Sequence, residues 1–285
     1  MLMRKLRSIV FLWVVLLTST SACDASPVMA PTAPPFPAPV SPTPLSDPAP
    51  WPTITPLPPD TGWEPAHPGI EVRSLDVAAG PSTERVTIAR LDPAAVRFEV
   101  HYVRGAAYPM SAWARQLGAF LVVSGGYFTP ERAVTGLTIS EGIRYGHPYG
   151  DYAGMFAVTE DGVVSVRWLR TWPYDPSEPL SAAIQSFPVL IRPGGILGFP
   201  ADGDDGRRSR RTVVAQDRAG RVLLLIAPRG HLSLHSLAVW LVGSDLDLDI
   251  ALNLDGGTSA GFWMSDGPSI DSLVGVPVVL AVLPR

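Results

Sequence analysis

The stretch that most constrains this chain runs from Ile250 to Phe262 and reads Ile-Ala-Leu-Asn-Leu-Asp-Gly-Gly-Thr-Ser-Ala-Gly-Phe. It predicts an apolar strand that ends at Asp255, followed by a tight turn at Gly256 and Gly257. Because glycine has no Cβ atom, a ligand can approach the main-chain N–H groups closely, and the acidic side chain lies directly beside them. If the protein has a chemical site, we expect part of it here.

The N-terminus carries the features of a secretory signal peptide. Three basic residues precede an apolar run from Ile9 to Leu17, and small residues follow as far as Ala22. This run is shorter than the roughly 20 apolar residues that a transmembrane helix needs. We therefore predict a signal peptide over residues 1–22.

Cys23 is the only cysteine of the chain, so an internal disulfide is impossible. The stretch Thr20-Ser-Ala-Cys23 resembles a bacterial lipobox, in which the cysteine becomes lipid-modified; the alternative is a free thiol within a retained signal peptide. Two or more acyl chains on Cys23 would anchor the protein to a membrane surface. The sequence thus predicts an extracytoplasmic protein that is lipid-anchored to the bacterial cell membrane.

Charge and composition restrict the possible partners and chemistry. The formal net charge is −4, and removal of residues 1–22 with their three positive charges gives −4 − 3 = −7. Lys5 is the only lysine, so the mature chain has no lysine nucleophile and no Schiff base. A nucleic-acid partner normally requires a basic surface, and we predict none here.

Residues 23–68 contain the proposed lipidated cysteine and a proline-rich segment, with 16 of the 31 prolines between Pro27 and Pro68. Proline lacks the N–H donor that helices and sheets need, so this composition favours an extended, semi-rigid spacer. We predict a linker that separates the membrane anchor from a single globular domain over residues 69–285.

The domain alternates short apolar segments with turn sequences. Strands are expected over 71–78, 83–92, 96–104, 120–124, 134–140, 154–159, 163–168, 182–191, 211–216, 221–227, 250–255, 260–264 and 276–283. Short helices are expected over 111–117 and 234–242, the second with Ser233 as its N-cap. Because hairpin turns rather than helical crossovers join the strands, we predict an α+β domain with a mostly antiparallel mixed sheet.

Two strand ends share one pattern. Ser124-Gly-Gly126 and Asp255-Gly-Gly257 each place a polar residue and paired glycines after an apolar strand, although either pair alone is also typical of a plain hairpin turn. Arg211-Thr212 opens a third strand, and Arg211 offers a planar, permanently charged group that suits phosphate or carboxylate. Together these segments predict three loops that converge on one pocket.

These segments resemble the phosphodiester glycosidase family. Its members have an Asn-Gly-Gly-Phe-Phe block, an Arg-Thr strand start, and a helix leading into Asn-Leu-Asp-Gly-Gly-Gly-Ser. The matching stretches here are Ser124-Gly-Gly-Tyr-Phe128, Arg211-Thr212 and Asn253-Leu-Asp-Gly-Gly-Thr-Ser259. Serine replaces the first asparagine, and Thr258 replaces the third glycine. The resemblance covers roughly residues 71–283 and indicates a bacterial lipoprotein member.

The resemblance implies cleavage between a sugar anomeric carbon and phosphate, in glycosyl phosphodiesters of envelope or extracellular polysaccharide. Asp255 is then the catalytic carboxylate and Arg211 the phosphate ligand, while Glu141 is either a second carboxylate or only a turn residue. The expected substrate-binding residues are Ser124, Gly125, Gly126, Phe128, Thr212, Asn253, Gly256, Gly257 and Ser259, the glycines through backbone N–H groups. The alternatives are a non-catalytic carbohydrate- or envelope-binding module and a hydrolase of ordinary glycosides.

No metal site or other cofactor is predicted. His231 and His235 are four residues apart, but no third ligand accompanies them, so we interpret them as a helix start. The run Asp202-Gly-Asp-Asp-Gly206 matches an EF-hand poorly, because the acidic twelfth position would fall on Val213. Looser calcium binding stays open.

Overall fold

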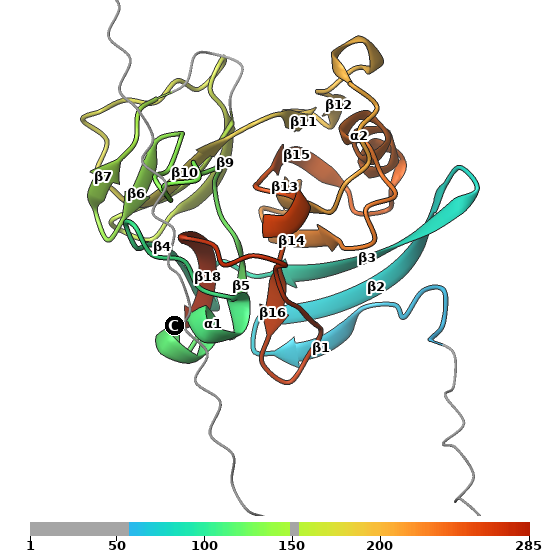
Figure 1. Ribbon diagram of the computed structural model, residues 1–285, viewed down its shortest axis with the longest axis horizontal. Coiled ribbons are helices and arrows are strands. Elements are labelled where there is room, and N and C mark those ends of the chain that lie inside the picture. The colour runs from blue at the N-terminus through green and yellow to red at the C-terminus, as the bar shows by residue number, and fades with distance from the viewer. Residues whose placement is uncertain (1–56, 149–153) are drawn as a thin grey trace, which may run out of the picture. The chain divides into compact units, whose positions relative to one another are not determined.

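The computed structural model describes residues 57–148 and 154–285. The predicted signal peptide, Cys23 and the proline-rich segment up to residue 56 lie outside the described residues. Every strand pair among the described residues is antiparallel. The predicted α+β domain with mostly antiparallel strands is therefore confirmed in part: the fold is rich in β structure with few helices, and it has three antiparallel sheets in place of one mixed sheet (Figure 1).

The largest sheet contains the strand that leads to Asp255. Its order is β1-β2-β3-β14-β13-β15-β11-β12, so β15 is an interior strand between β13 and β11. The bounds are β1 (Glu64–His67), β2 (Ile70–Ala79), β3 (Ser82–Leu91), β11 (Val189–Arg192), β12 (Ile196–Leu197), β13 (Arg211–Asp217), β14 (Val222–Ala227) and β15 (Leu248–Asn253).

Two five-stranded sheets complete the β structure. One has the order β7-β6-β10-β8-β9, and the other β17-β16-β5-β18-β4. The first contains β6 (Thr138–Ser140), β7 (Ile143–Tyr145), β8 (Gly154–Thr159), β9 (Val164–Trp168) and β10 (Leu180–Ser186). The second contains β4 (Val96–Tyr102), β5 (Leu121–Ser124), β16 (Phe262–Met264), β17 (Ser269–Ile270) and β18 (Val278–Pro284).

Both predicted helices are confirmed, and both cover sheets from outside. They are α1 (Met110–Leu117) and α2 (Leu234–Gly243), and two short 3₁₀ turns are η1 (Ala201–Gly203) and η2 (Gly257–Ser259). As predicted, Ser233 caps α2, because its side chain accepts a hydrogen bond from the Ser236 N–H. No helix in the described part of the chain has the length and apolar character needed to cross a membrane.

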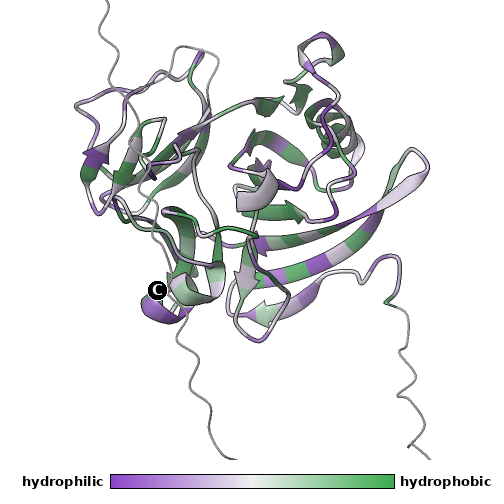
Figure 2. Ribbon diagram, viewed as in Figure 1, coloured by the Kyte–Doolittle hydropathy of each residue, from purple (hydrophilic) through white to green (hydrophobic). Residues whose placement is uncertain are grey.

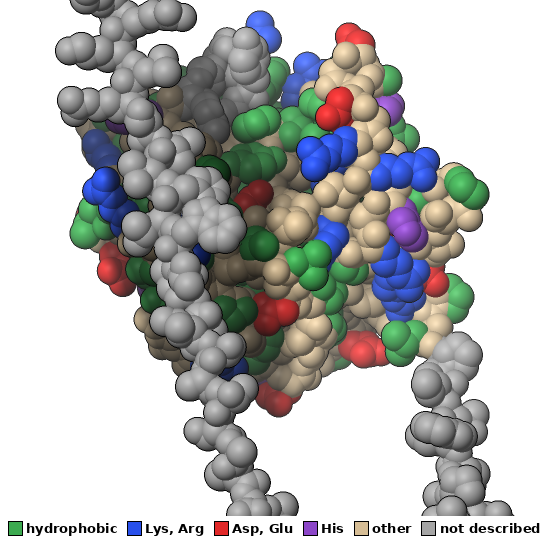
Figure 3. Space-filling view, viewed as in Figure 1, with side chains coloured by type: hydrophobic (Ala, Val, Ile, Leu, Met, Phe, Trp, Pro, Cys, Tyr) green, Lys and Arg blue, Asp and Glu red, His purple; other side chains and the backbone are tan. Residues whose placement is uncertain are grey.

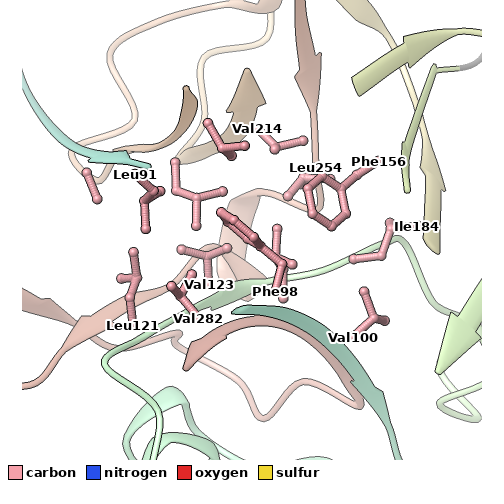
Figure 4. Packing of buried hydrophobic residues seen from close by; sticks show 14 of the residues in the cluster. Leu91, Phe98, Val100, Leu121, Val123, Phe156, Ile184, Val214, Leu254 and Val282 are labelled. Atoms are coloured by element: carbon pink, nitrogen blue, oxygen red, sulfur yellow. The ribbon is translucent and has the colours of Figure 1, made fainter. Parts of the chain in front are cut away.

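The main core lies where the three sheets face one another. Phe98 from β4, Phe156 from β8 and Val214 from β13 pack in one cluster, although each comes from a different sheet (Figure 4). Hydropathy agrees with a core on one face of the sheet, because green and purple bands alternate along β2 and β3 (Figure 2). Leu254, the residue before Asp255, belongs to this cluster and is fully buried, so the candidate site is built directly onto the core.

The single strand predicted over residues 182–191 is wrong. It is divided into β10 and β11, which belong to different sheets, and the break falls at the cis peptide bond between Phe187 and Pro188. Proline has no N–H to donate to a strand partner, and it restricts the residue before it. The chain therefore changes sheets at this point, beside the end of β15.

The folded domain begins earlier than the predicted boundary at residue 69. Glu64–His67 forms β1 against β2, and Asp60 makes an ion pair of 2.6 Å with Arg73. The sequence interpretation assigned this segment to the proline-rich linker. Pro65 is nevertheless compatible with a strand here, because β1 lies at the edge of its sheet, where a missing N–H donor is tolerated.

The packing of β8 against the Asp255 strand supplies a test of the fold. A Cβ added at Gly154 would lie 2.6 Å from Leu252 Cδ1 and 2.9 Å from Val189 Cγ2, both in the core. We expect Gly154→Ala to lower the free energy of unfolding by about 1–3 kcal/mol through overpacking, measured by urea denaturation. Gly243→Ala is the control, because an added Cβ there meets no atom within 4 Å. Equal stability of the two variants would contradict this packing.

Candidate active site

The ends of β5, β13 and β15 meet at one point, as the sequence predicted. The Asp255 N–H donates to the Gly125 carbonyl oxygen at 2.9 Å, and the Leu254 N–H donates to the Thr212 carbonyl oxygen at 2.9 Å. The Ser124 hydroxyl lies 2.9 Å from the Thr212 hydroxyl and donates to the Asp255 carbonyl oxygen at 3.2 Å. These bonds fix the main chain on both sides of the Asp255 side chain.

Asp255 is a largely buried carboxyl group with an altered proton affinity. Burial raises its pKa to about 6, although hydrogen bonds from the Ser259 side chain and the Gly256 N–H act in the opposite direction. The Gly256 N–H donates to Asp255 Oδ1 at 2.8 Å. A carboxyl group that titrates near neutrality in a partly accessible position suits acid–base or nucleophilic chemistry.

Arg211 is the first residue of β13, whose main chain runs beside the turn that follows Asp255. The register of β13 and β15 pairs Val213 with Asn253, and a Cβ on Gly256 would lie 3.8 Å from the Arg211 Cα. The Arg211 guanidinium donates to the Arg207 carbonyl oxygen at 2.6 Å, while its Nε is buried without a hydrogen-bond partner. Burial lowers the pKa of Arg211, although Tyr127, Asp204 and Asp205 oppose this shift.

The salt bridges found among the described residues do not include Arg211. A partly buried guanidinium that is in no salt bridge can bind an anionic ligand such as a phosphate. In Figure 3, arginine side chains (blue) gather on the side of the visible face where the loop before β13 and α2 lie, which favours approach of an anion there.

The expected N–H contacts from the paired glycines need correction. The Gly125 N–H donates to the Val278 carbonyl oxygen at 3.1 Å, and the Gly257 N–H to the Arg210 carbonyl oxygen at 2.8 Å. Together with the Gly256 bond to Asp255, three of the four predicted N–H groups are already used within the protein. Two of the glycines are needed for other reasons. A Cβ at Gly256 would lie 2.8 Å from the Arg210 carbonyl oxygen, and Gly257 has a φ of 63°, which side chains other than glycine rarely adopt.

Several expected substrate contacts are interior residues. Ser124 and Thr212 are 0% exposed and Asn253 is 1% exposed, because their polar groups join the strand ends to one another. Gly125, Gly126 and Ser259 are also buried, and Phe128 packs against the cluster around α1. Their place is beneath the site, while Asp255, Gly256, Gly257 and Arg211 are the partly accessible members. A sequence pattern cannot separate these two groups, because both follow strand ends.

Glu141 is not brought next to Asp255 by any contact among the described residues. It lies in the turn between β6 and β7 with φ of 52°, and its side chain is 74% exposed at 3.8 Å from His101 Nδ1. It lines a separate cavity of about 340 Å³ together with Glu99 and Glu160. The turn-residue interpretation fits this geometry better than a catalytic one.

The other polar candidates have structural partners. His231 Nδ1 lies 3.1 Å from the Thr83 carbonyl oxygen, and His235 Nδ1 lies 3.0 Å from that of Phe199. Among the described residues, no group of three His, Cys, Asp or Glu side chains is placed to hold a metal ion. Asp202 and Gly203 belong to the exposed turn η1, and the rest of the run continues into the loop before β13.

The sequence interpretation missed two aromatic residues at the site. The Tyr127 hydroxyl accepts a hydrogen bond from Asn253 Nδ2 at 2.7 Å and donates to the Phe187 carbonyl oxygen at 2.9 Å. The Phe187-Pro188 dipeptide inside an apolar run was the available signal, because proline marks a break in a strand. Tyr127 could have been noticed because it stands where the family block has phenylalanine.

The family model described as phosphodiester glycosidase matches residues 118–282. The catalytic domain of zebrafish N-acetylglucosamine-1-phosphodiester alpha-N-acetylglucosaminidase, auto-inhibited by its pro-peptide, is 19% identical with a TM-score of 0.62, over 77% of this chain and 85% of that one. A hypothetical protein from Synechocystis is 15% identical with a TM-score of 0.54, over 76% and 62%. Curated protein sequences give no significant match. At these identities, the two structures show a shared fold.

Burial of Asp255 predicts an unusual dependence of stability on pH. Its pKa rises from 3.8 to about 6 on folding, so the folded state binds the proton more tightly than the unfolded state. The wild-type protein therefore loses stability as the pH rises from about 4 to 6, by up to about 3 kcal/mol. We expect Asp255→Asn to be more stable than wild type above pH 6.5, with the difference disappearing near pH 4, in denaturation curves across pH.

Asp202→Asn, at an exposed turn, is the matched control and should show no such trend. A variant Asp255→Asn that is less stable than wild type at pH 7.5, with Asp202→Asn unchanged, would contradict the buried, destabilised carboxylate.

Proposed function

Because this chain belongs to the phosphodiester glycosidase family, we propose that it hydrolyses the bond between a sugar anomeric carbon and phosphate in glycosyl phosphodiesters of the cell envelope. The observation that carries this proposal is the position of two groups at adjacent strand ends: Asp255, a largely buried carboxyl group with a pKa of about 6, lies just beyond the end of β15, and the partly buried Arg211 begins the neighbouring strand β13. The Asp255 carboxylate can stabilise an electron-poor carbon, and the Arg211 guanidinium can stabilise an anionic leaving group.

Asp255 acts in its ionised form in this proposal. The sugar develops positive charge at the anomeric carbon as the C–O bond breaks, and a carboxylate in a site of low polarity stabilises that charge strongly. Water supplies the new C–O bond, and a proton leaves the water as the sugar hydroxyl forms. A pKa of about 6 leaves Asp255 largely ionised at neutral pH while keeping it basic enough to take that proton.

Arg211 receives the leaving group. The bonding electron pair departs with the phosphate oxygen, so the product monoester gains negative charge beside the guanidinium. A fixed positive charge at this position stabilises the transition state more than the ground state, because the additional charge appears only as the bond breaks. A phosphate monoester is a good leaving group, so a second carboxyl group as general acid is dispensable, which agrees with the place of Glu141 in an exposed turn that lines another cavity.

The position of the protein in the cell is also part of the proposal. A lipid on Cys23 would hold the chain at the outer face of the cell membrane, and the proline-rich segment that follows has the composition of a spacer. Such an anchor would place the active site among envelope polymers.

The enzyme proposal predicts a loss of activity at two residues. We expect wild type to release sugar from glycosyl 1-(methyl phosphate) diesters, with kcat/KM rising with pH through an apparent pKa of about 6. Asp255→Asn should lower kcat by at least about 100-fold. Arg211→Met should also lower kcat, because its charge acts in the transition state. A reducing-sugar assay with several sugars measures both.

The exposed Arg104→Met is the control for loss of one arginine and should keep wild-type kinetics. Binding of glycans without turnover by wild type and by Asp255→Asn alike would support a non-catalytic binding module instead. Turnover of aryl glycosides in preference to the phosphodiesters would indicate an ordinary glycosidase.

Lipid attachment is tested separately in a bacterial host that carries lipoprotein-processing enzymes. Radiolabelled palmitate should be incorporated into the full chain, and Cys23→Ser should abolish both the label and recovery in the membrane fraction. Equal labelling of wild type and Cys23→Ser would exclude this anchor.

A further inference from the structure

Phe187 is an exposed aromatic residue at the junction between β10 and β11. It is 47% exposed and belongs to none of the apolar clusters formed by the described residues. Its ring lies against Tyr127, with 5.0 Å between ring centroids and 40° between the planes. A ring that is nearly half exposed and lies outside these clusters adds little to the core.

The main chain at Phe187 is fixed by the candidate active site itself. Its carbonyl oxygen accepts hydrogen bonds from the Tyr127 hydroxyl at 2.9 Å and from Asn253 Nδ2 at 3.2 Å. The Asn253 N–H donates to the Pro188 carbonyl oxygen at 3.0 Å. These three bonds reach only main-chain oxygens of the Phe187-Pro188 dipeptide, so they fix the main chain that carries the ring and do not depend on the side chain at residue 187.

This aromatic pair is attached to the strand that leads to Asp255. Asn253 lies two residues before Asp255 at the end of the same strand. Tyr127 is close enough to Arg211 for its charge to oppose the lowering of the arginine pKa. Phe187 and Tyr127 are therefore joined by hydrogen bonds to Asn253, the last residue of the strand that leads to Asp255.

We propose that Phe187, supported by Tyr127, forms an aromatic platform on which the pyranose ring of the substrate stacks. The proposal rests on the proposed function and adds a specificity-determining residue to it. The C–H groups on one face of a pyranose form an apolar surface that matches an aromatic ring, and rigid aromatic side chains supply such contact area with little loss of conformational entropy. The platform orients the sugar so that its anomeric carbon faces Asp255 and its phosphate faces Arg211.

The test compares substitutions that keep or remove the ring face. Stacking is present in both the ground state and the transition state, so its loss raises KM and leaves kcat nearly unchanged. With glycosyl 1-(methyl phosphate) diesters, we expect Phe187→Ala and Phe187→Leu to raise KM roughly tenfold. Phe187→Tyr, which retains the ring, should stay within about threefold of wild type. Unfolding curves for each variant establish that the protein is folded.

Wild-type KM in Phe187→Leu would overturn the stacking, because leucine is apolar without a ring face. A loss of kcat in all three variants, including Phe187→Tyr, would likewise overturn it in favour of a purely structural role.

Failure of the proposed function is distinguished by the wild-type protein, which would then not hydrolyse any of the diesters. In that case the platform is tested by NMR titration with N-acetylglucosamine 1-phosphate. Shifts of the Tyr127 resonances in wild type that are lost in Phe187→Ala would support a sugar platform without catalysis. The absence of such shifts in wild type would overturn it.

Discussion

The hydrogen bonds that join the ends of β5, β13 and β15 hold the site together. They tie main-chain groups of Gly125, Thr212, Leu254 and Asp255 to one another, with the Ser124 hydroxyl at the centre. Two of these strands belong to one sheet and the third to another, so the bonds also connect two layers of the fold. The position of Asp255 therefore depends on the relative placement of the sheets, and not on the turn alone.

This framework explains the character of the carboxyl group. Leu254 is buried in the shared core, and the main chain cannot move outward to hydrate the next side chain without breaking the strand-end bonds. Burial raises the pKa of Asp255, and the folded protein carries a destabilised charge at neutral pH. Such a site lowers stability in return for reactivity, which is common where a carboxyl group must exchange protons near neutral pH.

Much of this arrangement could be predicted from the sequence, because short local motifs mark the strand ends. Apolar runs that end in Ser124-Gly-Gly and Asp255-Gly-Gly identify two of the three strand ends, and Arg211-Thr212 identifies the third. Threonine is tolerated at position 258, where the family has glycine, because the main chain there does not have a positive φ. The main chain at Gly257 does. What could not be predicted depends on distant contacts: whether Ser124 faces inward, where Glu141 lies, and how Phe187 reaches Asn253. Residue patterns report which side chains follow a strand, but burial is decided by the sheet that packs against it.

The central claim is that the bond broken joins the anomeric carbon, rather than phosphorus, to oxygen. Hydrolysis of a glycosyl 1-(methyl phosphate) diester in ¹⁸O-enriched water, followed by ³¹P NMR, tests this directly. With Asp255 facing the sugar carbon and Arg211 facing the leaving phosphate, the methyl phosphate product should contain no ¹⁸O and show no isotope shift. An ¹⁸O-shifted phosphorus signal would mean that water attacks phosphorus, and would contradict this assignment of the two residues.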